Sequence, residues 1–172
     1  AEALLARDDS PLREELRAAW LGLVEKVDPL AVVFDIGAVA REDEHIHLAA
    51  RRQLQERLGY CPTSDFVADY ELKLERDGKW DEFLACAQEA LGRPWPEAMH
   101  DFLAEDHFSE VMHRLNPALY TEPTSWMDAR VGGTAGSGTS VDETVRAMEA
   151  MLGFRGKGRT LFFVVDEVSQ YV

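Results

Sequence analysis

The chain has 172 residues, of which 46% are hydrophobic and 29% charged, so it can bury one sizeable core and lies within the size range of a single domain. Its net charge of −14 argues against broad electrostatic binding of nucleic acid through this segment, because phosphate contacts require clustered lysines and arginines. Two cysteines, Cys61 and Cys86, are too few for a disulfide framework, so we expect reduced thiols. The sequence shows no signal peptide and no apolar run approaching ~20 residues, so we expect a cytoplasmic protein without membrane contact.

The first predicted element is an amphipathic helix that begins near Ser10 and ends at Asp28 and Pro29. Ser10 is a favourable N-cap, and Pro11 suits the first helical turn. Apolar residues then recur at helical spacing, at Leu12, Leu16, Trp20, Leu23 and Val27. This spacing predicts a helix with one apolar face.

A short apolar segment follows at residues 30–36, between Pro29 and Gly37. Its length, its β-branched content and these two boundary residues predict a buried strand. Asp35 interrupts the apolar run near its end.

The next predicted helix covers residues 42–58 and stops at Gly59, a favourable C-terminal cap. Its apolar face consists of Ile46, Ala50, Leu54 and Leu58. His45 and His47 lie beside three acidic residues at the start of this helix, which raises the question of a metal site. Side chains two positions apart on a helix point to different sides, so a solvated helix start is the favoured interpretation.

A series of helices is predicted between residue 64 and residue 115. The segments 64–77 and 79–91 close at Gly78 and Gly92, and the second carries an inward stripe of Trp80, Phe83, Leu84 and Leu91. Two shorter helices are expected at 96–105 and 107–115, before Asn116 and Pro117 break the pattern. Residues 41–115 therefore form a predicted helical insertion between two strands.

Residues 116–139 are predicted to be a loop, because they contain Pro117, Pro123 and the run VGGTAGSGTS. Gly133 and Gly138 have the spacing of a G-x-x-x-x-G-K-[ST] phosphate loop, but Thr139 stands where that loop has its lysine. A flexible linker is therefore the favoured interpretation.

The run GFRGKGRT, residues 153–160, has a similar spacing with Arg159 in the lysine position. A strand follows it rather than a helix, so a bound phosphate would have no helix N-terminus to rest on, and a tight turn is favoured. Between the two glycine runs, Ser140 and Glu143 form a predicted capping box that starts a helix with Val145, Met148 and Leu152 on one face.

The last predicted element is a strand at residues 161–165, an unbroken run of aromatic, aliphatic and β-branched side chains. Such a run without polar alternation is typical of a parallel strand that is covered on both faces. Asp166 and Glu167 follow at its carboxyl end, where open α/β sheets bind ligands. Carboxylates there can hold Mg²⁺ and polarise a water for attack on a phosphate, as in the Walker B motif. The alternative is a strand that exits into an acidic turn.

Three stretches taken together carry a resemblance to a known family: FDIG at 34–37, ELKLERDGKWDEF at 71–83 and VVDEVSQYV at 164–172. With the helix and strand order around them, the chain from about Leu30 to Val172 resembles the P-loop ATPase of BREX and phage-growth-limitation defence systems, the BrxC/PglY type. Ser169 departs from the glycine common at that position in the family, and the glycine run at 132–138 has no counterpart that we can map.

The resemblance implies an α/β fold: a partial P-loop NTPase core of the AAA+-like kind, with parallel strands at 30–36 and 161–165 and a helical insertion. It implies a segment that runs from after the phosphate loop to the Walker B strand of a longer ATP-hydrolysing protein. By the family pattern Asp166 would organise Mg²⁺, Glu167 would activate the attacking water, and Gln170 would sense the γ-phosphate of ATP or a neighbouring group. Other defence-system proteins, and a further copy of the chain, are the implied partners.

A second class of function stays open beside this one. The segment would then be a non-catalytic, acidic helical module that docks to other proteins, and the Asp166–Glu167 pair would only terminate a strand. A phosphate loop upstream in the full-length sequence would separate the two hypotheses.

Overall fold

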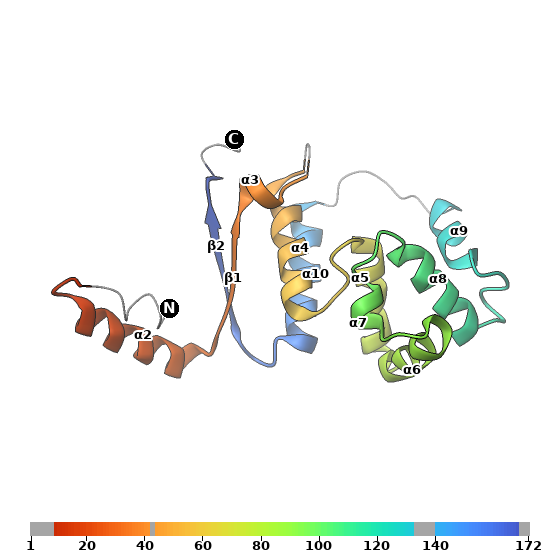
Figure 1. Ribbon diagram of the computed structural model, residues 1–172, viewed down its shortest axis with the longest axis horizontal. Coiled ribbons are helices and arrows are strands. Elements are labelled where there is room, and N and C mark those ends of the chain that lie inside the picture. The colour runs from red at the N-terminus through yellow and green to blue at the C-terminus, as the bar shows by residue number, and fades with distance from the viewer. Residues whose placement is uncertain (1–8, 42–43, 133–139, 169–172) are drawn as a thin grey trace.

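The structure is a computed structural model that describes residues 9–41, 44–132 and 140–168. Over these ranges the chain is mixed α/β, with mostly helices and a two-stranded parallel sheet. The molecule is elongated: helix α2 projects from one side of the sheet, α4 and α10 cover the other side, and a group of helices lies beyond them (Figure 1). The gaps at residues 133–139 and 169–172 hold the glycine run and Gln170, so predictions for these positions lie outside the described residues.

The elements run from an N-terminal helix to a C-terminal strand. In chain order they are α2 Arg13–Val27, β1 Pro29–Asp35, α3 Ile36–Val39, α4 Ile46–Leu58, α5 Asp65–Arg76, α6 Trp80–Leu91, α7 Trp95–Ala98, α8 Ala104–Leu115, α9 Ser125–Gly132, α10 Val141–Arg155 and β2 Thr160–Asp166. We call the group α5–α9 the helical lobe.

Strands β1 and β2 pair in parallel, with Pro29 opposite Thr160 and Asp35 opposite Asp166. Parallel neighbours need a crossover connection, which the intervening helices provide. The prediction that the segments 30–36 and 161–165 are parallel strands is confirmed.

The prediction that strand 161–165 is covered on both faces is wrong for the part of the chain that the structure describes. Phe162, Phe163 and Val164 are 37%, 36% and 53% exposed, and Val33 on the paired strand is 69% exposed. Only one face of the sheet joins a core: Leu30, Val32 and Phe34 are buried together with Leu54 and Leu58 of α4 and Met151 of α10. The opposite face has no helix packed on it among the described residues (Figure 1).

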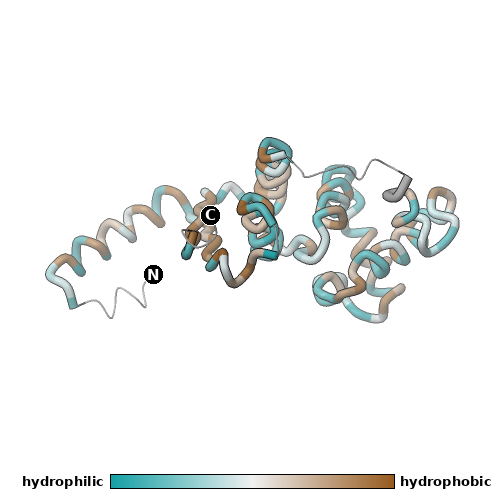
Figure 2. The backbone as a smooth tube through the Cα atoms, turned by 90° about the horizontal axis from the view of Figure 1, so that it is seen from above, coloured by the Kyte–Doolittle hydropathy of each residue, from teal (hydrophilic) through white to brown (hydrophobic). Residues whose placement is uncertain are grey.

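Helix α2 forms as predicted but does not bury its apolar face. It begins at Arg13, with Leu12 rather than Ser10 at the N-cap position, and none of its residues is buried. Leu12 and Leu16 are 53% and 48% exposed. Helical periodicity therefore predicted the secondary structure correctly, but none of the described residues covers the apolar face of α2. Alternating hydrophobic and hydrophilic residues along this helix are visible in Figure 2.

Helix α4 is shorter at its start than predicted. Its C-terminal glycine, Gly59, adopts φ 76°, as expected of a left-handed cap. Leu54 and Leu58 of the predicted apolar face are buried, whereas Ile46 is 39% exposed. Arg51 and Gln55 are buried in addition. Arg51 is buried because its guanidinium bonds the Asp69 carboxylate of α5 at 2.6 Å.

The helical lobe has its own aromatic core. Helices α5 and α6 match the predicted segments 64–77 and 79–91, and their turns place Gly78 and Gly92 at φ 68° and 70°. The predicted boundary at 105–107 is wrong: α7 ends at Ala98, and a single helix, α8, runs from Ala104 to Leu115. The rings of Phe83, Trp95, Phe108 and Trp126 pack together with centroids 4.6–5.4 Å apart.

The prediction of an uninterrupted loop over 116–139 is also wrong, because α9 occupies Ser125–Gly132. Trp126 on this helix is 2% exposed and packs its ring 4.6 Å from that of Phe66. Tertiary packing of one large side chain thus stabilises a helix in a segment whose prolines and glycines predicted a loop.

Helix α10 begins with the predicted capping box. The Ser140 hydroxyl accepts the Glu143 N–H at 3.2 Å, and the Glu143 carboxylate accepts the Ser140 N–H at 3.0 Å. The packed face is shifted from the prediction: Val145 is 40% exposed, whereas Thr144 and Met151 are buried. After α10 the chain turns through Lys157 and Gly158, both at positive φ, directly into β2. The run GFRGKGRT is thus the end of α10, a tight turn at residues 156–159 and the first residue of β2.

Candidate functional site

The carboxyl ends of β1 and β2 bring three acids to one end of the sheet. Asp35 and Asp166 are register partners at the last pair of the ladder, and Glu167 follows directly. We call Asp35, Asp166 and Glu167 the acidic edge. Parallel pairing explains why residues 131 positions apart in sequence meet here.

Asp35 has a structural task at this edge. Its Oδ1 accepts the N–H groups of Gly37 at 2.8 Å and Ala38 at 3.3 Å, which makes it the N-cap of α3. A carboxylate at a helix N-terminus satisfies otherwise unpaired donors and complements the helix dipole. The sequence showed Asp35 at the end of an apolar run, and the N-cap preference of Asp was the signal that would have predicted this role.

Asp166 and Glu167 are both exposed, and their backbone is bent sharply. The Asp166 Oδ1 accepts the Glu167 N–H at 2.8 Å, while Glu167 has φ 58°, a left-handed conformation uncommon for residues other than glycine. The bend directs the Glu167 side chain back toward β1 and α3. This is an arrangement that the sequence did not predict.

Gly37 provides the space for this approach. A Cβ at Gly37 would lie 3.3 Å from Asp35 Oδ1 and 3.6 Å from Glu167 Oε2. The two carboxylates therefore converge on the first turn of α3, over a residue without a side chain. Carboxylate oxygens are ligands of the type that Mg²⁺ prefers.

The described residues contain no group of three or more His, Cys, Asp or Glu side chains arranged to hold a metal ion. Mg²⁺ usually completes its octahedron with water and substrate phosphates, so a carboxylate pair that lacks a third protein ligand is compatible with it. The role of Asp166 as an Mg²⁺ ligand stays a prediction. His45 and His47 stack their rings with centroids 5.5 Å apart at the start of α4.

A second group of charged side chains joins α10 to the helical lobe. Arg155, the last residue of α10, donates from Nε to Glu75 Oε1 at 2.6 Å and also bonds the Gly59 carbonyl. Its guanidinium lies 3.6 Å from the centre of the Tyr60 ring and 4.8 Å from that of Trp80. Sequence analysis treated Arg155 only as part of a turn, because its partners lie 80 or more positions away.

Glu71 is a buried acid in the helical lobe that the sequence did not single out as a site. Its two oxygens accept the indole N–H of Trp95 at 2.5 Å and the backbone N–H of Cys61 at 2.8 Å. Burial raises the pKa of Glu71 to about 7, against the opposing effect of these two hydrogen bonds. The carboxyl group fixes α7 and the α4–α5 connection to α5.

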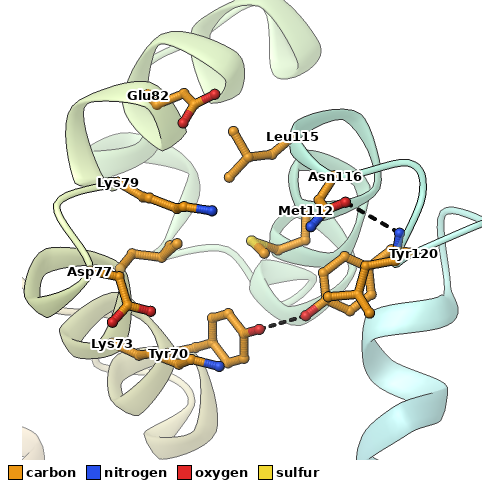
Figure 3. Close-up of a pocket in the computed structure, with 11 residues that line it drawn as sticks. Tyr70, Lys73, Asp77, Lys79, Glu82, Met112, Leu115, Asn116 and Tyr120 are labelled. Atoms are coloured by element: carbon orange, nitrogen blue, oxygen red, sulfur yellow. Dashed lines mark hydrogen bonds between the residues drawn. The ribbon is translucent and has the colours of Figure 1, made fainter.

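A pocket in the helical lobe lies between the end of α5, the start of α6 and the end of α8 (Figure 3). Its volume is about 170 Å³. Two lysines, Lys73 and Lys79, line it together with the tyrosines Tyr70 and Tyr120. We call it the two-lysine pocket.

No protein-family model matches this sequence, and no solved structure is significantly similar to the chain. Among the helices described, none combines the length and the apolar character needed to cross a bilayer.

Proposed function

We propose that this chain is a segment of an ATP-hydrolysing P-loop protein of a bacterial anti-phage defence system, to which it contributes the Walker B strand. The observation that carries the proposal is the parallel β1–β2 pair with Asp35, Asp166 and Glu167 at its carboxyl edge. Ligands of open α/β sheets bind at this edge. The resemblance of the FDIG, ELKLERDGKWDEF and VVDEVSQYV stretches to the defence-system ATPase family supports the same conclusion.

In this function the two consecutive acids have different tasks. Asp166 would hold Mg²⁺, whose positive charge would stabilise the phosphate groups of ATP, and Glu167 would orient and polarise the attacking water. Asp35 keeps α3 in place beside them through its cap. Gln170, which lies outside the described residues, is proposed to sense the γ-phosphate.

The exposed sheet face supports a larger sheet in the working protein. Val33, Phe162 and Val164 expose apolar surface on one face of a two-stranded sheet, and parallel sheets are normally covered on both faces. Further strands and helices that cover this face, from the rest of a P-loop core, would complete it. Partner proteins of the defence system and other copies of the chain then bind the complete module.

The test uses the full-length protein with its phosphate loop. Glu167→Gln keeps size but removes the charge that orients the water, so ATP should bind while turnover falls, typically 10²–10⁴-fold for a lost positioned base. Asp166→Asn should instead weaken the retention of Mg²⁺ and ATP. Nucleotide affinity, steady-state hydrolysis and phage plating are measured for each variant, with Glu25→Gln on exposed α2 as the matched control. Wild-type turnover in Glu167→Gln would refute the proposal.

A second candidate is a non-catalytic docking module. The observation that favours it is helix α2, which leaves Leu12, Leu16 and Leu21 about half exposed on a chain of net charge −14. In this case the full-length protein would bind a partner protein through α2, and phage protection would persist when Glu167 is replaced. Leu16→Asp would abolish binding of that partner. The P-loop proposal instead expects that ATP hydrolysis and phage protection are lost when Glu167 is replaced.

A further inference from the structure

The two-lysine pocket lies in the helical lobe, away from the acidic edge (Figures 1 and 3). Its inner wall is apolar, formed by Leu74 and Met112, which are each 4% exposed, and by Leu115. Most of its other lining groups are polar, and they come from the end of α5, the start of α6 and the turn after α8. The pocket thus combines a buried apolar wall with an opening that carries charges, as small-molecule sites usually do.

The cations of this pocket are unusual for the chain. Lys73 and Lys79 are two of only four lysines in the sequence, and neither forms an ion pair with any described residue. Lys73 places its Nζ 4.8 Å from the centre of the Tyr70 ring. In Figure 3 the Lys79 amine points into the pocket toward Met112 and Asn116. An ammonium group without a carboxylate partner is available to an anionic ligand.

The tyrosine pair offers a second hydrogen-bond donor. The hydroxyls of Tyr70 and Tyr120 bond each other, which uses one of their two O–H donors. The remaining O–H has no acceptor among the residues that the structure describes. Burial raises the pKa of the Tyr120 phenol, which favours its protonated, hydrogen-bonding form.

The size of the pocket limits the ligand. At about 170 Å³ it is close to the roughly 150 Å³ cavity that accepts benzene, and below the ~300–1,000 Å³ of sites for drug-sized ligands. A body of about six carbon atoms matches this volume.

We propose that the two-lysine pocket binds a small carboxylate with an apolar body, whose carbon chain lies on Leu74 and Met112 and whose carboxylate meets Lys79 and the free tyrosine hydroxyl. Asp77 and Glu82 also line the pocket, so a primary amine is the competing ligand that the test includes. The proposal does not depend on ATP hydrolysis at the acidic edge.

The experiment uses hexanoate as the probe and the methionine methyl groups as reporters. The 172-residue chain with ¹³C-labelled methionine methyls is titrated with hexanoate, hexanamide and hexylamine, and methyl resonances are followed by NMR. Hexanoate should produce a saturable shift of Met112, which lines the pocket, but none of Met151, which is buried under the sheet. Hexanamide should bind more weakly and hexylamine least.

Two lysine variants make the test specific. Lys79→Gln should weaken hexanoate binding about tenfold, the usual scale of a hydrogen bond to a charged group. Lys26→Gln, on exposed α2, is the matched control and should leave the affinity unchanged. The proposal is overturned if hexanoate gives no saturable Met112 shift, if hexylamine binds more tightly than hexanoate, or if Lys79→Gln binds hexanoate as the wild type does.

Discussion

At the scale of single residues, Glu71 couples the stability of the helical lobe to pH. Its folded pKa of about 7 lies above the ordinary value of 4.5 because the carboxyl group is buried. Between these two values the unfolded chain has lost a proton that the folded chain retains, so stability falls as the pH rises. This contribution is fully present below about pH 4.5 and is lost by pH 7 and above.

We therefore expect the free energy of unfolding to decrease by roughly 3 kcal/mol between pH 5 and pH 8 from this group alone. Urea unfolding followed by tryptophan fluorescence at several pH values measures the slope. Glu71→Gln cannot ionise, so its slope should be flatter than that of the wild type, although its amide cannot accept both hydrogen bonds and the variant is less stable overall. Parallel slopes in the two proteins would show that Glu71 does not titrate in this range.

Arg155 is the residue that joins α10 to the lobe. Its side chain and that of Glu75 are 16% and 10% exposed, so removal of the guanidinium leaves a largely buried carboxylate without its partner. Arg155→Met should lower the free energy of unfolding by about 3–5 kcal/mol, the usual cost of breaking a buried pair. Arg146→Met, on the exposed side of the same helix, should change it by less than about 0.5 kcal/mol.

Chemical denaturation of both arginine variants checks this prediction. In the double variant Arg155→Met with Glu75→Gln, part of the lost stability should return, because the carboxylate charge is gone. Equal stability of the Arg155→Met and Arg146→Met proteins would mean that the contacts of Arg155 contribute little to the fold.

At the scale of secondary structure, α9 depends on Trp126. This side chain is 2% exposed and packs on Phe66 and Phe108. Trp126→Ala should destabilise the chain by about 3–5 kcal/mol, as large core truncations do. Trp20→Ala on α2, where no residue is buried, should cost far less. Circular dichroism during urea unfolding compares the two, and a similar midpoint for both variants would contradict the packing argument.

Local sequence signals predicted the elements whose cause is local. Gly59 predicted the end of α4, and Ser140 predicted the start of α10. The two apolar runs predicted both strands and the acids at the carboxyl end of β2. Tertiary effects could not be predicted in this way. Helix α9 lies in a segment rich in proline and glycine, and Arg51 is buried by an ion pair with Asp69 of the next helix, which no local pattern indicates.

Periodicity also shows which face of a helix is apolar but not whether anything covers that face. Helix α2 and the outer face of β2 illustrate this limit, since both were predicted from their patterns and neither is buried. The convergence of Glu167 on Gly37 could not be predicted either. It follows from the parallel register and from a left-handed residue after the strand.

At the scale of the whole molecule, we expect no ATP binding by the 172 residues alone. The sequence contains no G-x-x-x-x-G-K-[ST] motif, so it has no lysine and loop amides to hold the β- and γ-phosphates, and Mg²⁺ on one or two carboxylates binds weakly. Isothermal titration calorimetry with Mg²⁺ and ATP should give no detectable heat of binding. Tight, Mg²⁺-dependent binding would mean that one of the two glycine runs is a phosphate site.

The division into two cores has a consequence for the order in which the chain acquires structure during synthesis. The lobe core draws its buried residues from Cys61 to Trp126, a continuous stretch. The sheet core instead needs Leu30 together with Met151 and Leu161. Once residue 132 has left the ribosome, every residue of the lobe core has been synthesised, whereas the strand that pairs with β1 has not. A nascent chain halted there should already protect Trp126 from proteolysis, and it should leave β1 open to cleavage until β2 emerges.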